Sequence, residues 1–193
     1  YCLEELRLNR RFAPTIYDTV VGITGSADHP VVEDNGNASA IEYAVRMREF
    51  AQEALASRLL TNGGLSAAHI DALAVRIAAF HAVTGVAASG SPYGTPESVI
   101  SPARDNFSQL ERLLPEATDQ TRLAELRAWT EREYQRQWVQ FSARHAQGSV
   151  RECHGDLHLR NICLFEGKPR LFDCIEFNDA IATIDVLYDV SFL

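Results

Sequence analysis

The sequence has 193 residues, of which 46% are apolar, so it can form one or two packed cores but not a large multidomain enzyme. Its net charge of −8, without a dense run of Lys or Arg, excludes a protein that binds the nucleic-acid backbone through a positive face. No apolar stretch reaches the roughly 20 residues that span a bilayer. We therefore expect a cytoplasmic protein without membrane contact, whose separated cysteines stay reduced.

The first part of the chain predicts one helix and two strands. Apolar and charged residues over 3–12 form the pattern of a short amphipathic helix, which Pro14 ends. β-branched residues dominate 16–24 and predict a strand. A turn-like Asp-Asn-Gly-Asn at 34–37 then precedes strict alternation over 41–47, which is typical of a strand with one buried face.

Helical spacing replaces the strand pattern from Phe50 onward, for about a hundred residues. Ser66 is a plausible N-cap of a helix that ends near Gly85, and two more helices are predicted over 103–113 and 119–146. His81, on an otherwise apolar helix face, is expected to be a packed residue.

Short apolar segments return after Gly148, and Glu-Gly-Lys-Pro at 166–169 has the composition of a hairpin turn between two of them. We divide the chain into a part made of one helix and strands, residues 1–49, and a mainly helical part with this hairpin, residues 50–193.

The segment 153–161, Cys-His-Gly-Asp-Leu-His-Leu-Arg-Asn, carries polar residues where a core segment would be apolar. Asp156 is followed five positions later by Asn161, and Asp173 lies across the predicted hairpin. Phosphoryl transfer needs one group that orients the attacking hydroxyl, and acidic or amide oxygens that hold Mg²⁺ against the phosphates. These three residues supply that set.

The pattern His154-x-Asp156-x4-Asn161 followed by Asp173 resembles the catalytic motif and the metal-binding aspartate of the aminoglycoside phosphotransferases, relatives of the protein kinases. The resemblance implies an α+β, two-lobed protein kinase-like fold, here with a partial small β lobe followed by a helical lobe. It also implies transfer of a phosphate from Mg-ATP, with GTP as the alternative donor, to a hydroxyl group of a small, neutral or cationic molecule.

The resemblance assigns a role to each polar residue of this region. Asp156 would orient or deprotonate the substrate hydroxyl. Asn161 and Asp173 would bind magnesium, with Glu176 as a further metal or substrate ligand. Two histidines flank the aspartate: His154 would organise the loop, and His158 would contact the transferred phosphate. Asp185 and Asp189 resemble a later D-x-x-x-D pattern of these enzymes, whose role is mostly structural.

Nucleotide-binding residues are implied in the first part of the chain. Glu4 or Glu5 would be the helix glutamate that pairs with a lysine of the small lobe, and Glu5 is favoured because the residues three and seven positions later are apolar. Val45, Met47 and Arg48 would belong to the hinge that faces adenine. The glycine-rich loop and the lysine of this family belong upstream of the first helix. Tyr1 is not a start methionine, and residues 184–193 stop within an apolar run, so we expect a fragment cut at both ends.

Two other interpretations remain open. The opening segment and the residues after Asp173 most resemble a bacterial branch fused to a P-loop ATPase, which makes a catalytically silent nucleotide-binding or scaffold module the first alternative. The triplet of His154, Asp156 and His158 is also compatible with a transition-metal site of a hydrolase, because alternate residues of an extended segment face one side. That second alternative leaves Asn161 and Asp173 unexplained.

Overall fold

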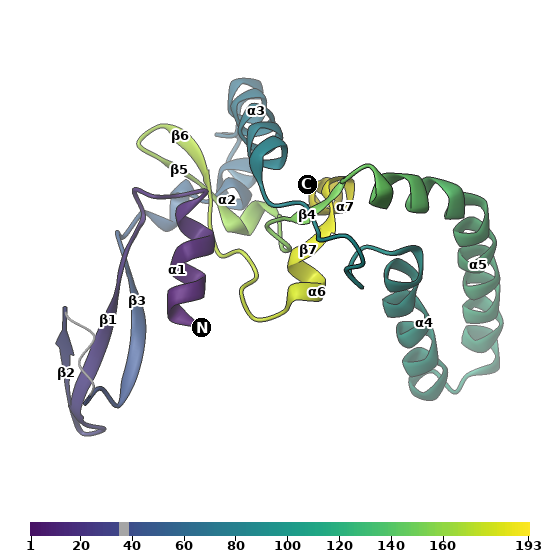
Figure 1. Cartoon of the computed structure of the whole chain (residues 1–193), viewed down its shortest axis with the longest axis horizontal. Helices are drawn as coiled ribbons and strands as arrows, with labels where there is room; N and C mark the ends of the chain where they lie inside the picture. Colours follow the sequence, from purple (N-terminus) through teal and green to yellow (C-terminus); the bar gives the residue numbers. More distant parts are fainter. Residues whose placement is uncertain (35–38) are drawn as a thin grey trace.

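The computed structural model describes residues 1–34 and 39–193, and it is an α+β fold (Figure 1). Helix α1, Cys2–Arg10, precedes a three-stranded antiparallel sheet in the order β2-β1-β3. The strands are β1, Tyr17–Ser26; β2, His29–Glu33; and β3, Glu42–Met47. The predicted helix and both predicted strands are confirmed. Of the predicted turn at 34–37, residues 35–37 lie outside the described residues.

Strand β2 was missing from the predictions, because its exposed residues carry little apolar alternation. It pairs with β1 through a tight hairpin in which Ser26 lies opposite His29. Gly25 has a φ of +84°, and a Cβ at this position would lie 2.4 Å from the carbonyl oxygen of His29. The close approach therefore requires glycine.

The middle of the chain is helical, as predicted. Ser66 and His69 form a capping box at the start of α3, which confirms the predicted N-cap. The next helix begins seven residues earlier than predicted, because Thr95 caps it and a proline occupies its first position. The helices are α2, Ala56–Thr61; α3, Ala67–Val83; α4, Pro96–Leu113; and α5, Ala117–Ala146, with a 3-10 turn η1 over Gln52–Ala54.

The last part of the chain consists of short elements around two small sheets. The predicted hairpin is formed by β5, Ile162–Phe165, and β6, Lys168–Leu171. Strand β4, Val150–Glu152, pairs with β7, Thr183–Asp185, which the sequence pattern did not predict. The remaining elements are η2, Leu159–Asn161; α6, Asp179–Ala182; α7, Val186–Asp189; and η3, Val190–Phe192.

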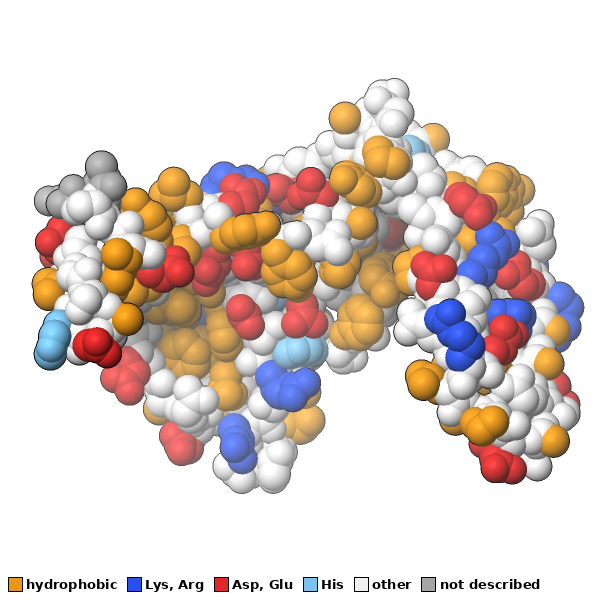
Figure 2. Space-filling view, turned by 90° about the horizontal axis from the view of Figure 1, so that it is seen from below, with side chains coloured by type: hydrophobic (Ala, Val, Ile, Leu, Met, Phe, Trp, Pro, Cys, Tyr) orange, Lys and Arg blue, Asp and Glu red, His pale blue; other side chains and the backbone are white. Residues whose placement is uncertain are grey.

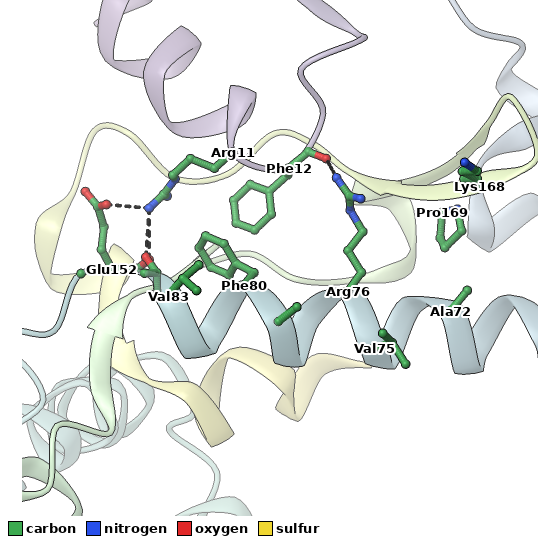
Figure 3. A pocket seen from close by; sticks show the side chains of 13 residues that line it. Arg11, Phe12, Ala72, Val75, Arg76, Phe80, Val83, Glu152, Lys168 and Pro169 are labelled. Atoms are coloured by element: carbon green, nitrogen blue, oxygen red, sulfur yellow. Dashed lines mark hydrogen bonds and ion pairs between the residues drawn. The ribbon is translucent and has the colours of Figure 1, made fainter.

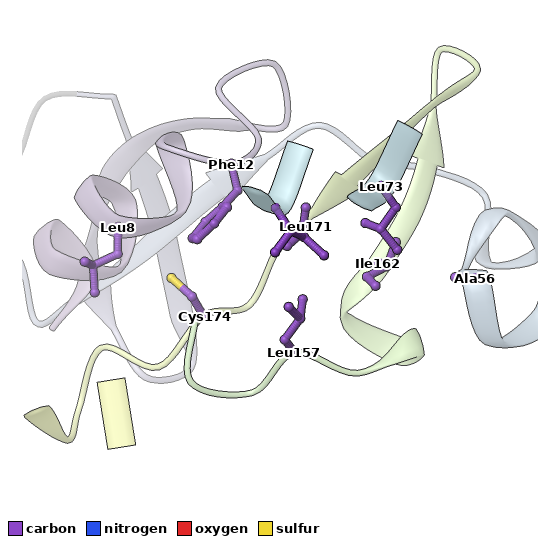
Figure 4. Packing of buried hydrophobic residues seen from close by; sticks show 9 residues of the cluster. Leu8, Phe12, Ala56, Leu73, Leu157, Ile162, Leu171 and Cys174 are labelled. Atoms are coloured by element: carbon purple, nitrogen blue, oxygen red, sulfur yellow. The ribbon is translucent and has the colours of Figure 1, made fainter. Parts of the chain in front are cut away.

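The hydrophobic core joins α1 to α3 and to the hairpin (Figure 4). Leu8 and Phe12 pack with residues of α3, of the loop after β4 and of both hairpin strands. A second cluster around Ile16 and Tyr17 includes Cys163 and Phe165 of β5. Helices α4 and α5 project away from this body as a separate hairpin (Figure 1). The division into two lobes at residue 49 stays a prediction.

Candidate active site

The loop between β4 and η2 is organised by His154, which is completely buried. Its Nε2 lies 2.9 Å from the carbonyl oxygen of Phe172, and its Nδ1 accepts a long, 3.4 Å hydrogen bond from the backbone N–H of Asp156. Burial lowers the pKa of His154, so the ring is neutral. Both ring nitrogens are occupied, which fits an organising role and leaves neither nitrogen free to bind a metal.

Asp189 of α7 holds the same loop through hydrogen bonds to its backbone. Its carboxylate accepts the backbone N–H groups of His154, at 3.3 Å, and of Gly155, at 3.0 Å. It also lies 2.8 Å from Nε2 of His81 on α3. Burial acts to raise the pKa of Asp189, but the three hydrogen bonds outweigh it and the pKa is lowered. The buried carboxylate is therefore ionised, and His81 is a polar partner as well as a packed residue.

Asp185 has a different structural role, in agreement with the mostly structural role that the family resemblance implied. It caps α7 by accepting the backbone N–H of Leu187 at 2.8 Å. It also binds the guanidinium of Arg144 through both carboxylate oxygens, at 2.6 and 2.8 Å. This pair fixes the end of α5 to β7.

Asn161 brings the predicted catalytic and metal-binding residues together. Its Nδ2 donates to Oδ2 of Asp156 at 3.0 Å, to the carbonyl oxygen of Asp156 at 3.0 Å and to the carbonyl oxygen of Asp173 at 3.5 Å. Only 6% of Asn161 is exposed. Because the amide nitrogen makes all of these bonds, Oδ1 is left as the atom that can bind a cation.

Asp173 lies in an exposed turn after β6, with a left-handed φ of 60° that is rare for a residue other than glycine. Two side chains of the first part of the chain hold this turn. Tyr17 Oη accepts the N–H of Asp173 at 3.0 Å, and Asn9 Oδ1 accepts the N–H of Cys174 at 3.0 Å. Burial raises the pKa of Tyr17, so its hydroxyl stays protonated.

Sequence reasoning missed both anchors. Asn9 is completely buried and also donates to the carbonyl oxygen of Glu5 at 3.0 Å. A polar residue on the apolar side of the amphipathic helix, between Leu8 and Phe12, was the signal that could have identified it.

Glu5 faces the same space as Asp173 and Glu176. Burial and the negative charges of Glu176 and Asp173 raise the pKa of Glu5. Within residues 1–34 and 39–193, no cation forms an ion pair with Glu5, and the single lysine of the sequence, Lys168, lies on β6. Several acidic side chains lie in the middle of the face seen in Figure 2. They are next to the hollow that separates the main body from the projecting helices α4 and α5. Mutual repulsion of this kind is relieved by a bound divalent cation.

His158 lies beside the candidate catalytic carboxylate. Its Nε2 is 3.4 Å from Oδ2 of Asp156, and both side chains are partly accessible, with 29% and 48% exposed. Its Nδ1 is buried and has no acceptor in the described part of the chain. This histidine is therefore close enough to assist Asp156, and its contact with a phosphate stays a prediction.

The predicted hinge residues do not share one environment. Val45 packs against the second core cluster, whereas Met47 and Arg48 are exposed. The guanidinium of Arg48 lies 4.9 Å from the ring centre of Phe165, and its backbone N–H donates to Ile16 at 2.8 Å. Their contact with a nucleotide stays a prediction.

Comparisons with known proteins place the chain in a family. The chain is similar to the uncharacterized proteins Rv2004c of Mycobacterium tuberculosis and Mb2027c of Mycobacterium bovis, each 25% identical over 192 residues. The matched region covers 100% of this chain and 36% of each relative, so the chain spans about a third of the length of these relatives. No solved structure matches it significantly. None of the described helices is long and apolar enough to cross a membrane. The model of the phosphotransferase enzyme family matches residues 26–193, and the chain belongs to this family.

Proposed function

We propose that this chain carries the transfer site of an ATP-dependent phosphotransferase that acts on a hydroxyl group of a small molecule. The observation that supports it best is the position of Asn161, whose amide touches both the carboxylate of Asp156 and the backbone of Asp173. The carboxylate of Asp156, which can accept a proton, therefore lies next to the oxygen atoms of Asn161 and Asp173, which can bind a cation. A P-loop ATPase in the same longer protein is part of the proposal, as is a two-lobed arrangement around the nucleotide.

The donor set suits magnesium rather than a softer metal. Asn161 Oδ1 and the carboxylates of Asp173 and Glu176 are hard oxygen ligands, and the thiols nearby are buried with raised pKa values. Magnesium, when bound, neutralises phosphate oxygens and holds the terminal phosphate in place. Asp173 and Asn161 are the residues that would hold it.

Asp156 performs the proton step in the proposed reaction. The hydrogen bond from Asn161 fixes one carboxylate oxygen, and the 48% exposure of the side chain leaves room for the acceptor hydroxyl. Asp156 orients this hydroxyl and takes its proton as the oxygen bonds to the terminal phosphorus and the bond to the nucleoside diphosphate breaks. His158 beside it would offset negative charge on the transferred group.

Two substitutions test the proposal in the full-length protein, with the P-loop lysine of the proposed ATPase replaced so that this other domain neither binds nor hydrolyses ATP. Asp173→Ala should remove the magnesium-dependent part of ATP binding, because it deletes a metal ligand. Asp156→Ala should keep that binding and abolish ATP turnover. Asp71→Ala, at an exposed position of α3, is the matched control. Calorimetry with and without Mg²⁺ measures binding, and release of ADP measures turnover. Normal Mg-ATP binding by Asp173→Ala would contradict the proposal.

A catalytically silent nucleotide-binding module is the second candidate. It rests on the resemblance of the opening segment and of the residues after Asp173 to the branch fused to a P-loop ATPase. Under this alternative, this site binds Mg-ATP through Asp173 but neither hydrolyses it nor transfers phosphate to any hydroxyl compound. The same two measurements therefore separate the two candidates.

A further inference from the structure

A groove of about 820 Å³ runs along α3, between this helix, the turn after α1 and strand β6 (Figure 3). Its size lies within the range of about 300–1,000 Å³ typical of small-molecule sites. Residues 153–161 and Asp173, which form the candidate active site, do not line it. The groove is therefore a separate cavity for which the proposed reaction has no use.

One wall of the groove is apolar and accessible. Ala72, Val75, Ala79 and Val83 follow one another at helical spacing along α3. Val75 is 71% exposed and Val83 is 83% exposed, although both are aliphatic. The rings of Phe12 and Phe80 lie in the groove, 4.1 Å apart (Figure 3). Phe12 is only 1% exposed and forms the floor, so Val75, Val83 and the half-buried ring of Phe80 are the surface that a ligand could contact.

The polar residues of the groove leave positive charge uncompensated. The Arg76 guanidinium donates to the carbonyl oxygen of Phe12, while its buried Nε has no acceptor in the described part of the chain. Burial and the neighbouring charge of Arg170 lower the pKa of Arg76, and no described carboxylate forms an ion pair with it. Lys168 lines the same groove at its β6 side (Figure 3).

The opposite end of the groove also carries no net negative charge. Its one carboxylate, Glu152, is shared by two arginines, with Arg7 and Arg11 each 2.6 Å from it. A cationic groove in a chain of net charge −8 is a local feature rather than a general property of the surface. A partly buried cation without a counter-ion is unfavourable, and a bound anion would offset that cost.

We propose that the groove binds a small amphipathic carboxylate. Its alkyl or aromatic body would lie on Val75, Val83 and the ring of Phe80. Its carboxylate would face Arg76 and Lys168. The charges select an anion, the aliphatic wall selects an apolar body, and the volume suits a small molecule.

The groove adjoins the loop that holds the candidate active site. The ring of Phe12 lies 5.2 Å from that of His154, and Glu152 directly precedes the loop. Binding of a ligand in the groove should therefore also change the NMR signals of His154, which lies on the other side of the Phe12 ring. This gives a binding readout that does not depend on phosphate transfer.

Octanoate is the probe for this proposal. NMR titration should show a single site, with contacts from its methylene protons to the ring of Phe80 and shifts of the ring signals of Phe12 and His154 behind it. Val75→Asp should weaken binding about tenfold or more, since it places a negative charge on the apolar wall. Lys168→Gln should weaken it about threefold. Both positions are exposed, so neither change disturbs the core.

Two controls are matched to these variants. Val139→Asp changes a valine of α5 that is 72% exposed, close to the 71% of Val75. Arg58→Gln removes an exposed cation of α2. Both should bind octanoate like the parent chain. Equal weakening in the controls and in the groove variants would overturn the proposal.

Two further probes separate the anionic and apolar requirements. Acetate carries the charge without the body, and 1-octanol carries the body without the charge. Both should bind at least about tenfold more weakly than octanoate. An octanol affinity equal to that of octanoate would refute the role of the cations, and no detectable binding of octanoate would refute the site.

Discussion

Replacement of Asp189 by asparagine tests whether this buried carboxylate holds the catalytic loop. The side chain is 1% exposed and accepts three hydrogen bonds, from His81 and from the backbone of His154 and Gly155. Asparagine keeps the volume but loses the charge, and its NH₂ group turns toward a donor. Bonds to a buried charge contribute roughly 1.5–3 kcal/mol each and are not additive, so we expect the free energy of unfolding to fall by about 2–4 kcal/mol.

Urea unfolding at pH 7 measures this loss, and hydrogen exchange at the Gly155 amide locates it. The matched control is Asp185→Asn, which breaks the contact with Arg144 but does not touch the loop. Both variants should lose stability, but only Asp189→Asn should speed exchange at Gly155. Unchanged exchange at Gly155 in this variant would refute the anchoring role.

The effect of Asp189 should depend on pH with a definite sign. Its pKa in the folded protein is below the usual 3.8, so folding favours the ionised form. The stabilisation is fully present above the pKa of the unfolded chain and is lost as pH falls through the lower, folded pKa. The stability difference between the parent and Asp189→Asn should therefore shrink below about pH 4. A difference that stays constant down to pH 2 would contradict this assignment.

Three further predictions concern the turn that carries Asp173 and the four thiols. Tyr17→Phe should lower the free energy of unfolding by about 1 kcal/mol in urea titrations, because one backbone N–H loses its acceptor. Asn9→Ala should cost about 2–3 kcal/mol, since it leaves the buried N–H of Cys174 unpaired, and it should speed hydrogen exchange there. Burial raises the pKa of Cys163 to about 11 and that of Cys174 to about 12. Ellman's reagent at pH 8 should therefore titrate only Cys2 in the folded chain, and four thiols in urea. Four rapidly reacting thiols in the folded chain would contradict the burial.

The features that could be predicted from sequence are those with a local physical cause. The capping box at Ser66 and the β5–β6 hairpin each depend on residues that are neighbours along the chain. The loop motif was identifiable because Asp156 and Asn161 are five residues apart and polar in an apolar setting. Their hydrogen bond follows from that short separation.

The features that could not be predicted depend on partners far along the sequence. Strand β7 is only three residues long and forms through pairing with β4. His81 looked like a packed residue, because nothing near it in sequence reveals the carboxylate 108 positions later. The same is true of Asn9 and Tyr17, whose partners are fixed by tertiary packing.

The anchoring of the turn that carries Asp173 has a consequence for the order of folding. The acceptors of its two N–H groups lie 156 and 165 positions earlier in the chain. Closing segments of that length is entropically costly, whereas α3 and the β5–β6 hairpin need only local contacts. During synthesis on the ribosome, Asn9 can meet its partner only after residue 174 has emerged. Protection of the Asp173 and Cys174 amides should thus be among the last events in refolding.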